Sequence, residues 1–247
     1  MFALEPGRRM IPKGLSVVLV EPQYPVNVGH IARVAKNFGV KKLCLIDPKV
    51  DMSVASVYAA HAAEVLESAR VISFARLRRE SQLLVATTAV RASRGSNVTR
   101  RMVKPEKLSS IVGASKTSAL VFGRDSTGLT NDEIAACDVT TTLDTGTGYR
   151  TLNVGHAVAI LLYLIRRGDG GEGHAQSREA RELFARSFYE LALESRLASH
   201  RAKNMKEVAK RIAASSGLTD SQLYLMTGVF RKATSTMNWG QARDSKT

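Results

Sequence analysis

The sequence has few of the residues that build disulfide scaffolds and metal sites. Its 247 residues include two cysteines, Cys44 and Cys137, which are too few and too far apart for a disulfide framework or a zinc cluster. The five histidines share no metal-ligand spacing with one another or with the cysteines. We therefore expect no bound metal, and the scarcity of cysteine makes a cytoplasmic location the default expectation.

Long apolar runs are also missing. No stretch reaches the roughly 18–20 apolar residues of a membrane span. The first 14 residues contain no apolar segment of the kind found in a signal peptide. The longest apolar run, residues 157–165, has the length of a buried helix. These absences predict a protein without membrane contact.

Two common nucleotide-binding motifs are absent as well. No G-x-G-x-x-G sequence follows the first expected strand, and G-x-x-x-x-G-K-[ST] occurs nowhere. A nucleophile elbow is lacking too. The sequence therefore gives no support for a standard dinucleotide site, a P-loop or a hydrolase triad.

What the chain has in excess is positive charge. It contains 36 Lys+Arg and 22 Asp+Glu, a formal net charge of +14. An excess of this size indicates a polyanionic partner, most often nucleic acid, although a general solubility role is the plainer alternative. From residue 174 onward the chain contains 13 Lys+Arg and 7 Asp+Glu, so the positive charge is shared between this part and the part before it.

Apolar runs that alternate with helical patterns predict an α/β fold with a mostly parallel sheet. A segment with four glycines in six residues follows, and beyond it the pattern is helical only, which predicts two or three helices. We expect a tail at 1–14, a main domain at 15–167, a linker at 168–175 and a helical domain at 176–247. Strands are expected at 16–20, 42–46, 81–88, 118–123 and 139–143, and helices at about 30–38, 53–69, 105–112 and 130–137.

The segment 27–39 contains polar residues that the helical core pattern does not use. Asn27, Arg33 and Asn37 lie outside the apolar stripe of this helix. Arg33 is near the helix N-terminus, where it could bind phosphate. A capped helix with a solvated arginine is the alternative. The stripe itself, at i, i+3, i+4 and i+7, consists of Ile31, Val34, Ala35 and Phe38.

Two further segments follow expected strands, where open α/β sheets place their ligands. Residues 121–133 include Gly123 and Gly128, which permit close approach of the backbone, and the charged pair Arg124 and Asp125. Residues 142–165 form a Gly-rich loop before an apolar helix that starts near Asn153. Either segment could instead be an ordinary connection.

A basic loop is expected at 90–104, with five basic residues and no acid. Its position after a strand favours contact with a nucleic acid backbone over a merely solvated loop. The candidate residues for contact with nucleic acid are Arg91, Arg94, Arg100 and Arg101, together with Arg124 and Tyr149.

Three motifs occur in order along the chain. The first, N-x-G-x-x-A-R-x-x-x-N-F-G, is matched at Asn27, Gly29, Ala32, Arg33, Asn37, Phe38 and Gly39. The second, F-G-R-E followed by G-L, is present with Asp125 in the Glu place, and the third, a Leu-Asn loop before an apolar helix, is present with Gly155 where Ser or Ala is usual. Taken together, these segments resemble the SPOUT class of methyltransferases, in particular the TrmH and TrmJ branch that methylates ribose 2′-OH groups of RNA.

The resemblance implies a SPOUT fold with a C-terminal trefoil knot, a homodimer, and S-adenosylmethionine bound in a bent conformation. It implies that Arg33 of one subunit approaches the cofactor of the other, as proton acceptor or phosphate ligand. Asn27 and Asp125 are the further candidate catalytic residues. Cofactor contacts are expected from Thr88, Gly123, Leu143, Leu152 and Asn153.

The activity that the resemblance implies is methylation of a ribose 2′-OH in tRNA, with cytidine 32 of the anticodon loop as the expected target. Two alternatives stay open. One is 2′-O-methylation at another tRNA or rRNA site, and the other is a non-catalytic RNA-binding protein on the same scaffold.

Overall fold

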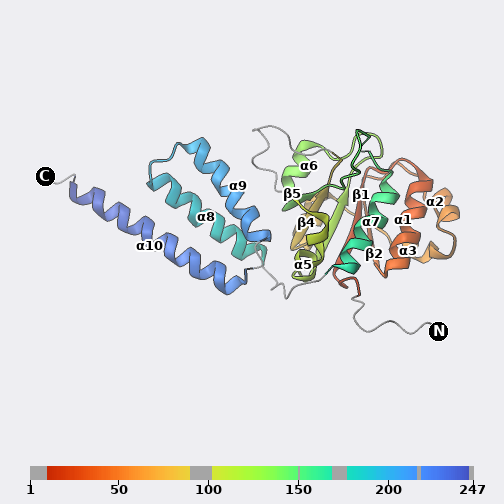
Figure 1. Cartoon of the computed structure of the whole chain (residues 1–247), viewed down its shortest axis with the longest axis horizontal. Helices are drawn as coiled ribbons and strands as arrows, with labels where there is room; N and C mark the ends of the chain where they lie inside the picture. The colour runs from red at the N-terminus through yellow and green to blue at the C-terminus, as the bar shows by residue number, and fades with distance from the viewer. Residues whose placement is uncertain (1–9, 90–101, 150, 169–176, 216–217, 245–247) are drawn as a thin grey trace.

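The structure, a computed structural model, describes residues 10–89, 102–149, 151–168, 177–215 and 218–244. In these residues a parallel sheet carries helices on both faces, and three further helices stand to one side of it (Figure 1). Four of the residues predicted to contact RNA lie outside the described ranges: Arg91, Arg94, Arg100 and Arg101.

Seven strands form one sheet in the order β3-β2-β1-β6-β4-β7-β5, and all six pairings between them are parallel. The central strands β1 and β6 are buried along their whole length, as expected for a strand covered on both faces. The prediction of an α/β fold with a parallel sheet is confirmed. The strands are β1 (Leu15–Val20), β2 (Lys42–Ile46), β3 (Arg70–Val71), β4 (Leu83–Thr87), β5 (Met102–Val103), β6 (Ser118–Phe122) and β7 (Val139–Thr141).

We call the described residues up to 168 the sheet domain. Its helices pack in two layers, because successive side chains of each strand point to opposite faces of the sheet. Val17 and Leu19 of β1 share a core with α1, α5 and α7, while Val18 and Val20 share one with α4 and α6. The helices are α1 (Pro25–Phe38), α2 (Met52–Ala59), α3 (Ala63–Glu67), α4 (Phe74–Glu80), α5 (Leu108–Gly113), α6 (Asn131–Ala136) and α7 (Val154–Arg167), with short 3-10 turns η1 (Ala60–Ala62) and η3 (Pro105–Lys107).

The first helix begins earlier than predicted. It starts at Pro25 instead of His30, because proline is well suited to the first turn, where its missing N–H has no helical partner. It ends at Phe38, with Gly39 in the left-handed conformation (φ 74°) as its cap. The predicted stripe faces the core, with Ile31 and Ala35 fully buried.

The helix predicted for residues 53–69 is broken. Ala60 has a φ of 48° and ends α2, after which η1 and α3 follow. Close packing keeps α2 in place, since a Cβ on Gly29 of α1 would lie 2.5 Å from the Ala55 carbonyl oxygen and 2.6 Å from the Tyr58 Cβ. Three further elements, β3, α4 and β5, were not predicted from the sequence. Two of these are strands of two residues, and α4 buries only Leu77.

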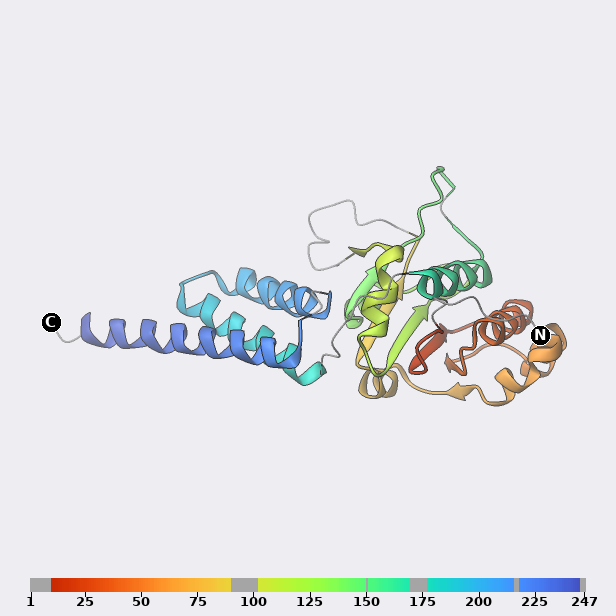
Figure 2. The ribbon, with the colours of Figure 1, turned by 60° about the horizontal axis from the view of Figure 1, so that its bottom comes forward.

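Three helices follow the sheet domain and form what we call the helical extension. They pack around Phe184, Phe188 and Phe230, and α10 is the longest of them (Figure 2). None of the described helices is long and apolar enough to cross a membrane. The three are α8 (Arg178–Glu194), α9 (Ser199–Ser215) and α10 (Asp220–Asp244), so the sequence-based expectation of two or three helices agrees with the structure, while the predicted domain boundaries stay predictions.

Candidate active site

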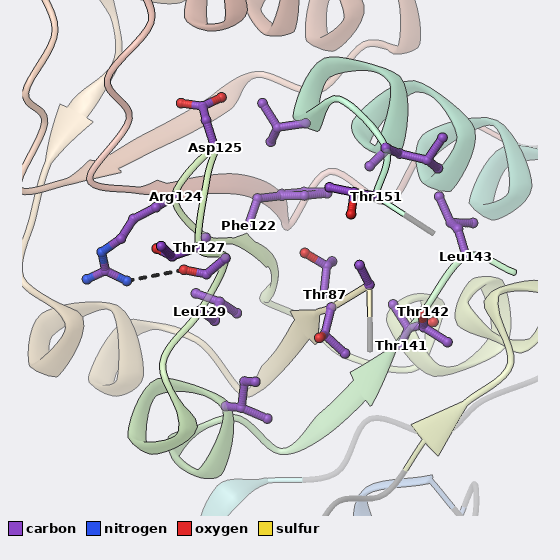
Figure 3. Close-up of a pocket in the computed structure, with 18 of the residues that line it drawn as sticks. Thr87, Phe122, Arg124, Asp125, Thr127, Leu129, Thr141, Thr142, Leu143 and Thr151 are labelled. Atoms are coloured by element: carbon purple, nitrogen blue, oxygen red, sulfur yellow. Dashed lines mark hydrogen bonds between the residues drawn. The ribbon is translucent and has the colours of Figure 1, made fainter. Parts of the chain in front are cut away.

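A cavity of about 410 Å³ lies at the carboxyl ends of β4, β6 and β7. This volume falls in the range of small-molecule sites. Figure 3 shows Thr141, Thr142 and Leu143 on one side of the cavity and the loop with Arg124 and Asp125 on another. Its apolar lining includes Phe122, Leu129, Ile134, Leu143, Val154 and Leu161, and its hydroxyl groups come from Ser126 and from Thr87, Thr88, Thr127, Thr141, Thr142 and Thr151.

Four of the five residues predicted to contact a cofactor line this one cavity: Thr88, Gly123, Leu143 and Leu152. They come from three segments that are far apart in the sequence. The fifth, Asn153, caps α7 by accepting hydrogen bonds at Oδ1 from the Gly155 and His156 amides at 2.8 and 3.4 Å. The structure thus gathers these residues, and their contact with a ligand stays a prediction.

The loop after β6 forms one wall of the cavity and folds tightly back on itself. The Arg124 amide donates to the Gly128 carbonyl at 3.2 Å, and the Gly128 amide donates to the Arg124 carbonyl at 2.9 Å. A Cβ on Gly123 would lie 2.1 to 2.5 Å from backbone atoms of Gly128 and Leu129. Only glycine therefore fits at position 123 without moving this wall.

The three motifs meet in a chain of side-chain hydrogen bonds. Asn27 Nδ2 donates to Asp125 Oδ1 at 2.5 Å, and Asn153 Nδ2 donates to Asn27 Oδ1 at 2.9 Å. The Gln23 amide reaches the second oxygen of Asp125 at 3.4 Å. The start of α1, the loop after β6 and the start of α7 are thereby joined at the rim of the cavity.

Arg124, predicted to contact RNA, pairs with two carboxylates. Its guanidinium donates to Glu133 at 3.0 and 3.1 Å and also to Glu21. The hydrogen bonds to Glu133 and then to Glu21 raise the pKa of Arg124. Burial acts to raise the pKa of Glu133, but the hydrogen bonds from Arg124 and the Thr130 amide outweigh it and lower that pKa. These pairs hold the cavity wall against β1 and α6, and an RNA contact at Arg124 stays a prediction.

Arg33 differs from Arg124 in having no partner among the residues that the structure describes. It is exposed on α1 and makes no hydrogen bond or ion pair with any residue that the structure describes. Asn37 is also exposed, and Tyr149 is 81% exposed in the loop before α7. Arg33 is thus available to bind an anion from outside the chain.

Several residues of the cavity were not predicted from the sequence. Phe122 and Thr141 are the last residues of β6 and β7, and Thr142 and Thr151 lie in the loop between β7 and α7. Their position at strand ends was the available signal, since parallel strands bring their carboxyl ends to one edge of the sheet. No group of three potential metal ligands occurs in the described part of the chain.

The chain is similar to proteins of known family. The sequence profile described as the SpoU rRNA Methylase family matches residues 14–163. A protein of Methanocaldococcus jannaschii named tRNA (cytidine-2′-O-)-methyltransferase TrmJ is 30% identical over 227 residues, which cover 88% of this chain and 98% of that one. A Salmonella typhimurium protein named tRNA (cytidine/uridine-2′-O-)-methyltransferase TrmJ is 33% identical over 159 residues, 62% of this chain and 64% of that one.

A solved structure shows the same fold. The probable methylase family protein from Haemophilus influenzae Rd KW20 superposes with a TM-score of 0.68 at 23% identity. The match covers 92% of this chain and 99% of the other, so it includes residues beyond the sheet domain.

Proposed function

The chain belongs to the SpoU rRNA Methylase family, and from this membership we propose that it transfers the methyl group of S-adenosylmethionine to a ribose 2′-hydroxyl of tRNA. The observation that carries the proposal is the match to the Methanocaldococcus jannaschii methyltransferase over nearly the whole length of both chains. The cavity at the carboxyl ends of β4, β6 and β7 is the proposed cofactor site.

The cavity suits S-adenosylmethionine in its chemistry. Apolar side chains such as Phe122 and Leu161 can cover a flat adenine, and the threonine hydroxyls offer hydrogen bonds to polar groups. Asp125 at the rim provides negative charge near a sulfonium. When bound, the cofactor supplies an electrophilic methyl group. The residues proposed to hold it are Thr88, Gly123, Leu143, Leu152 and Asn153.

Arg33 is the proposed contact with the reacting nucleotide. Its exposed guanidinium can bind a phosphate next to the target ribose through two parallel hydrogen bonds. A guanidinium carries only donor groups, so it is poorly suited to accept the proton of the ribose hydroxyl. We therefore assign to Arg33 the alignment of the ribose oxygen with the methyl carbon, which is where positioning contributes most to rate. Asn27 and Asp125 are the proposed supports of this geometry.

A homodimer is part of the proposal, with Arg33 of one copy beside the cavity of the other. Its support is an exposed apolar face on helices that pack side by side, α1 with α2 and α1 with α7. Val57 and Tyr58 of α2 and Ile160 and Tyr163 of α7 are exposed there. Val57→Asp should shift the mass in solution from dimer to monomer, whereas Val71→Asp, an exposed valine on the edge strand β3, should not. A dimer that survives Val57→Asp would contradict this assignment.

We propose that residues 118–167 form a trefoil knot. Its support is that β7 lies beyond β4 in the sheet, while α7, the next element, packs on α1. The loop between them thus returns across the ends of β4 and β6, where Thr142 and Thr151 line the cavity with Thr87 and Gly123.

The proposed target is cytidine 32 of the anticodon loop. The motifs and the basic helical extension support it, and Tyr149 and the arginines at 91, 94, 100 and 101 are the proposed RNA contacts. Uridine at the same position is a second candidate, because the Salmonella relative carries both bases in its name. A different tRNA or rRNA site, or RNA binding without catalysis, remains the competing function.

One experiment separates these functions. The chain is incubated with tritiated S-adenosylmethionine and a tRNA transcript, and with a matched transcript that carries 2′-deoxycytidine at position 32. Label on the first transcript but not on the second supports the proposal. Equal labelling of both transcripts would mean that the methylated nucleotide is not position 32, and binding of tRNA without any label favours the non-catalytic function.

A further inference from the structure

The contact between the helical extension and the sheet domain contains a buried carboxylate with two arginines. Arg181 of α8 is 2% exposed, and its Nη1 lies 3.3 Å from Asp138 Oδ1. Its Nη2 donates to the carbonyl of Gln82. Arg178, one turn earlier, places Nη2 3.4 Å from Asp138 Oδ2 and donates to the carbonyl of Arg78. Asp138 is thus the acidic centre of this contact.

Asp138 is also fixed to the sheet. Its Oδ2 accepts a hydrogen bond from the Leu84 amide at 2.8 Å, and its own amide donates to the Leu84 carbonyl at 3.0 Å. Its side chain is 4% exposed. A carboxylate buried to this degree needs its cationic partners, because an unpaired buried charge is strongly unfavourable. Loss of Arg181 would therefore draw Asp138 toward solvent and disturb its attachment to β4.

Asp138 stands one residue before β7, and β7 has only three residues. At about 3.3 Å per residue, Asp138 and Thr141, three positions apart, are separated by roughly 10 Å. Thr141 ends the strand, and Thr141, Thr142 and Leu143 line the cavity. Thr141 is fixed on both sides, because its carbonyl accepts from the Thr88 amide at 3.1 Å and its Oγ1 donates to the Val103 carbonyl at 2.9 Å.

From this geometry we infer that Arg181 is a positioning residue for the cofactor cavity, acting through Asp138 and β7. The helical extension then supports the wall that Thr141 and Leu143 contribute, in addition to any contact it makes with RNA. The inference rests on the proposed function, since it takes the cavity to bind S-adenosylmethionine. Its direct consequence is that cofactor affinity depends on α8 in the absence of RNA.

Calorimetry with S-adenosylhomocysteine, the unreactive product, tests this consequence on the full chain without RNA. Arg181→Ala should raise the dissociation constant about 5- to 20-fold, or about 1–2 kcal/mol at 1.4 kcal/mol per factor of ten. Arg181→Lys should restore part of the loss. Arg186→Ala, an exposed arginine on the same helix, should bind like the unchanged chain. A folded Arg181→Ala chain with unchanged affinity overturns the inference and leaves the proposed function intact. No binding to the unchanged chain overturns both.

Hydrogen exchange on the unchanged chain gives a second test that needs no variant to fold. Addition of S-adenosylhomocysteine should slow exchange of the amides at 139–143 and also of those in the first turns of α8, near Arg181. Slowing at 139–143 alone, with α8 unchanged, would show that the wall and the extension are independent and would overturn the inference.

Discussion

Asn27 Nδ2 donates a hydrogen bond of 2.5 Å to Asp125 Oδ1, which links the first turn of α1 to the loop after β6. Asn27 at the same time accepts from Asn153 at the start of α7. One amide side chain therefore sets the relative position of three segments around the cavity. It can do so because an amide side chain has both a donor and an acceptor: its Nδ2 donates to Asp125 and its Oδ1 accepts from Asn153.

Removal of Asp125 should lower turnover more than cofactor binding. Asp125→Ala deprives the Asn27 amide of a charged acceptor, a contribution of about 1.5–3 kcal/mol. We expect kcat to fall roughly 10- to 100-fold, with each 1.36 kcal/mol giving a factor of ten. Single-turnover methylation at saturating cofactor measures it. Asp132→Asn, an exposed acid on α6, serves as the control. An Asp125→Ala enzyme with unchanged kcat would separate this hydrogen bond from catalysis.

Arg33 should be needed for methylation and dispensable for the fold. Arg33→Ala removes an exposed side chain without a described partner, so the melting temperature and the affinity for S-adenosylhomocysteine of the folded chain should stay the same. The rate should fall by about a factor of 100 or more, because alignment of the ribose is lost. Arg33→Lys should recover little, since lysine lacks the planar fork. Full activity in Arg33→Ala would remove Arg33 from the site, and Lys41→Ala, an exposed cation after the same helix, controls for general charge.

Gly123→Ala should damage the cavity wall. The added methyl would meet the backbone of Gly128 and Leu129 at 2.1 to 2.5 Å, so the loop must move. Overpacking of this kind costs typically about 1–3 kcal/mol of stability. Urea denaturation measures the loss, and calorimetry should show weaker cofactor binding. The matched change Gly113→Ala meets no atom within 4 Å and should leave both quantities unchanged. Wild-type binding by Gly123→Ala would mean that this wall does not contact the cofactor.

The ion pair of Glu133 with Arg124 should contribute to stability at neutral pH and not in acid. The pKa of Glu133 is lowered in the folded chain, so the stabilisation is complete above the ordinary glutamate pKa of about 4.3. It is lost as the pH falls through the lowered folded value. The difference in free energy of unfolding between the unchanged chain and Glu133→Gln should therefore be largest near pH 7 and shrink below about pH 4. Urea titrations at pH 7, 5, 4 and 3 check this, with Glu106→Gln as an exposed control. A difference that stays the same from pH 7 to pH 3 would point to a contribution other than charge.

The sequence predicts the central sheet well and its edges poorly, for a physical reason. β1, β2 and β6 are covered on both faces and appear as unbroken apolar runs, so their bounds were predicted within one residue. Strands of two residues such as β3 and β5 bury too little to leave a pattern. Part of the cavity lining could be predicted from the sequence, because several lining residues lie at strand ends or in the family motifs. The pairing of Arg124 with Glu21 did not, because it depends on contacts between residues far apart in the sequence.

The pairing of β1 with β6 has a consequence for how the chain is made. Leu15 pairs with Ser118, so β1 lacks one of its two neighbours until about 100 further residues have been synthesised. At about 5–20 residues per second this takes roughly 5–20 s. During that time the edge of β1 that pairs with β6 has no partner within the chain, and an unpaired apolar strand edge is a template for pairing between chains. Slow translation up to Phe122 should then lower the yield of native protein.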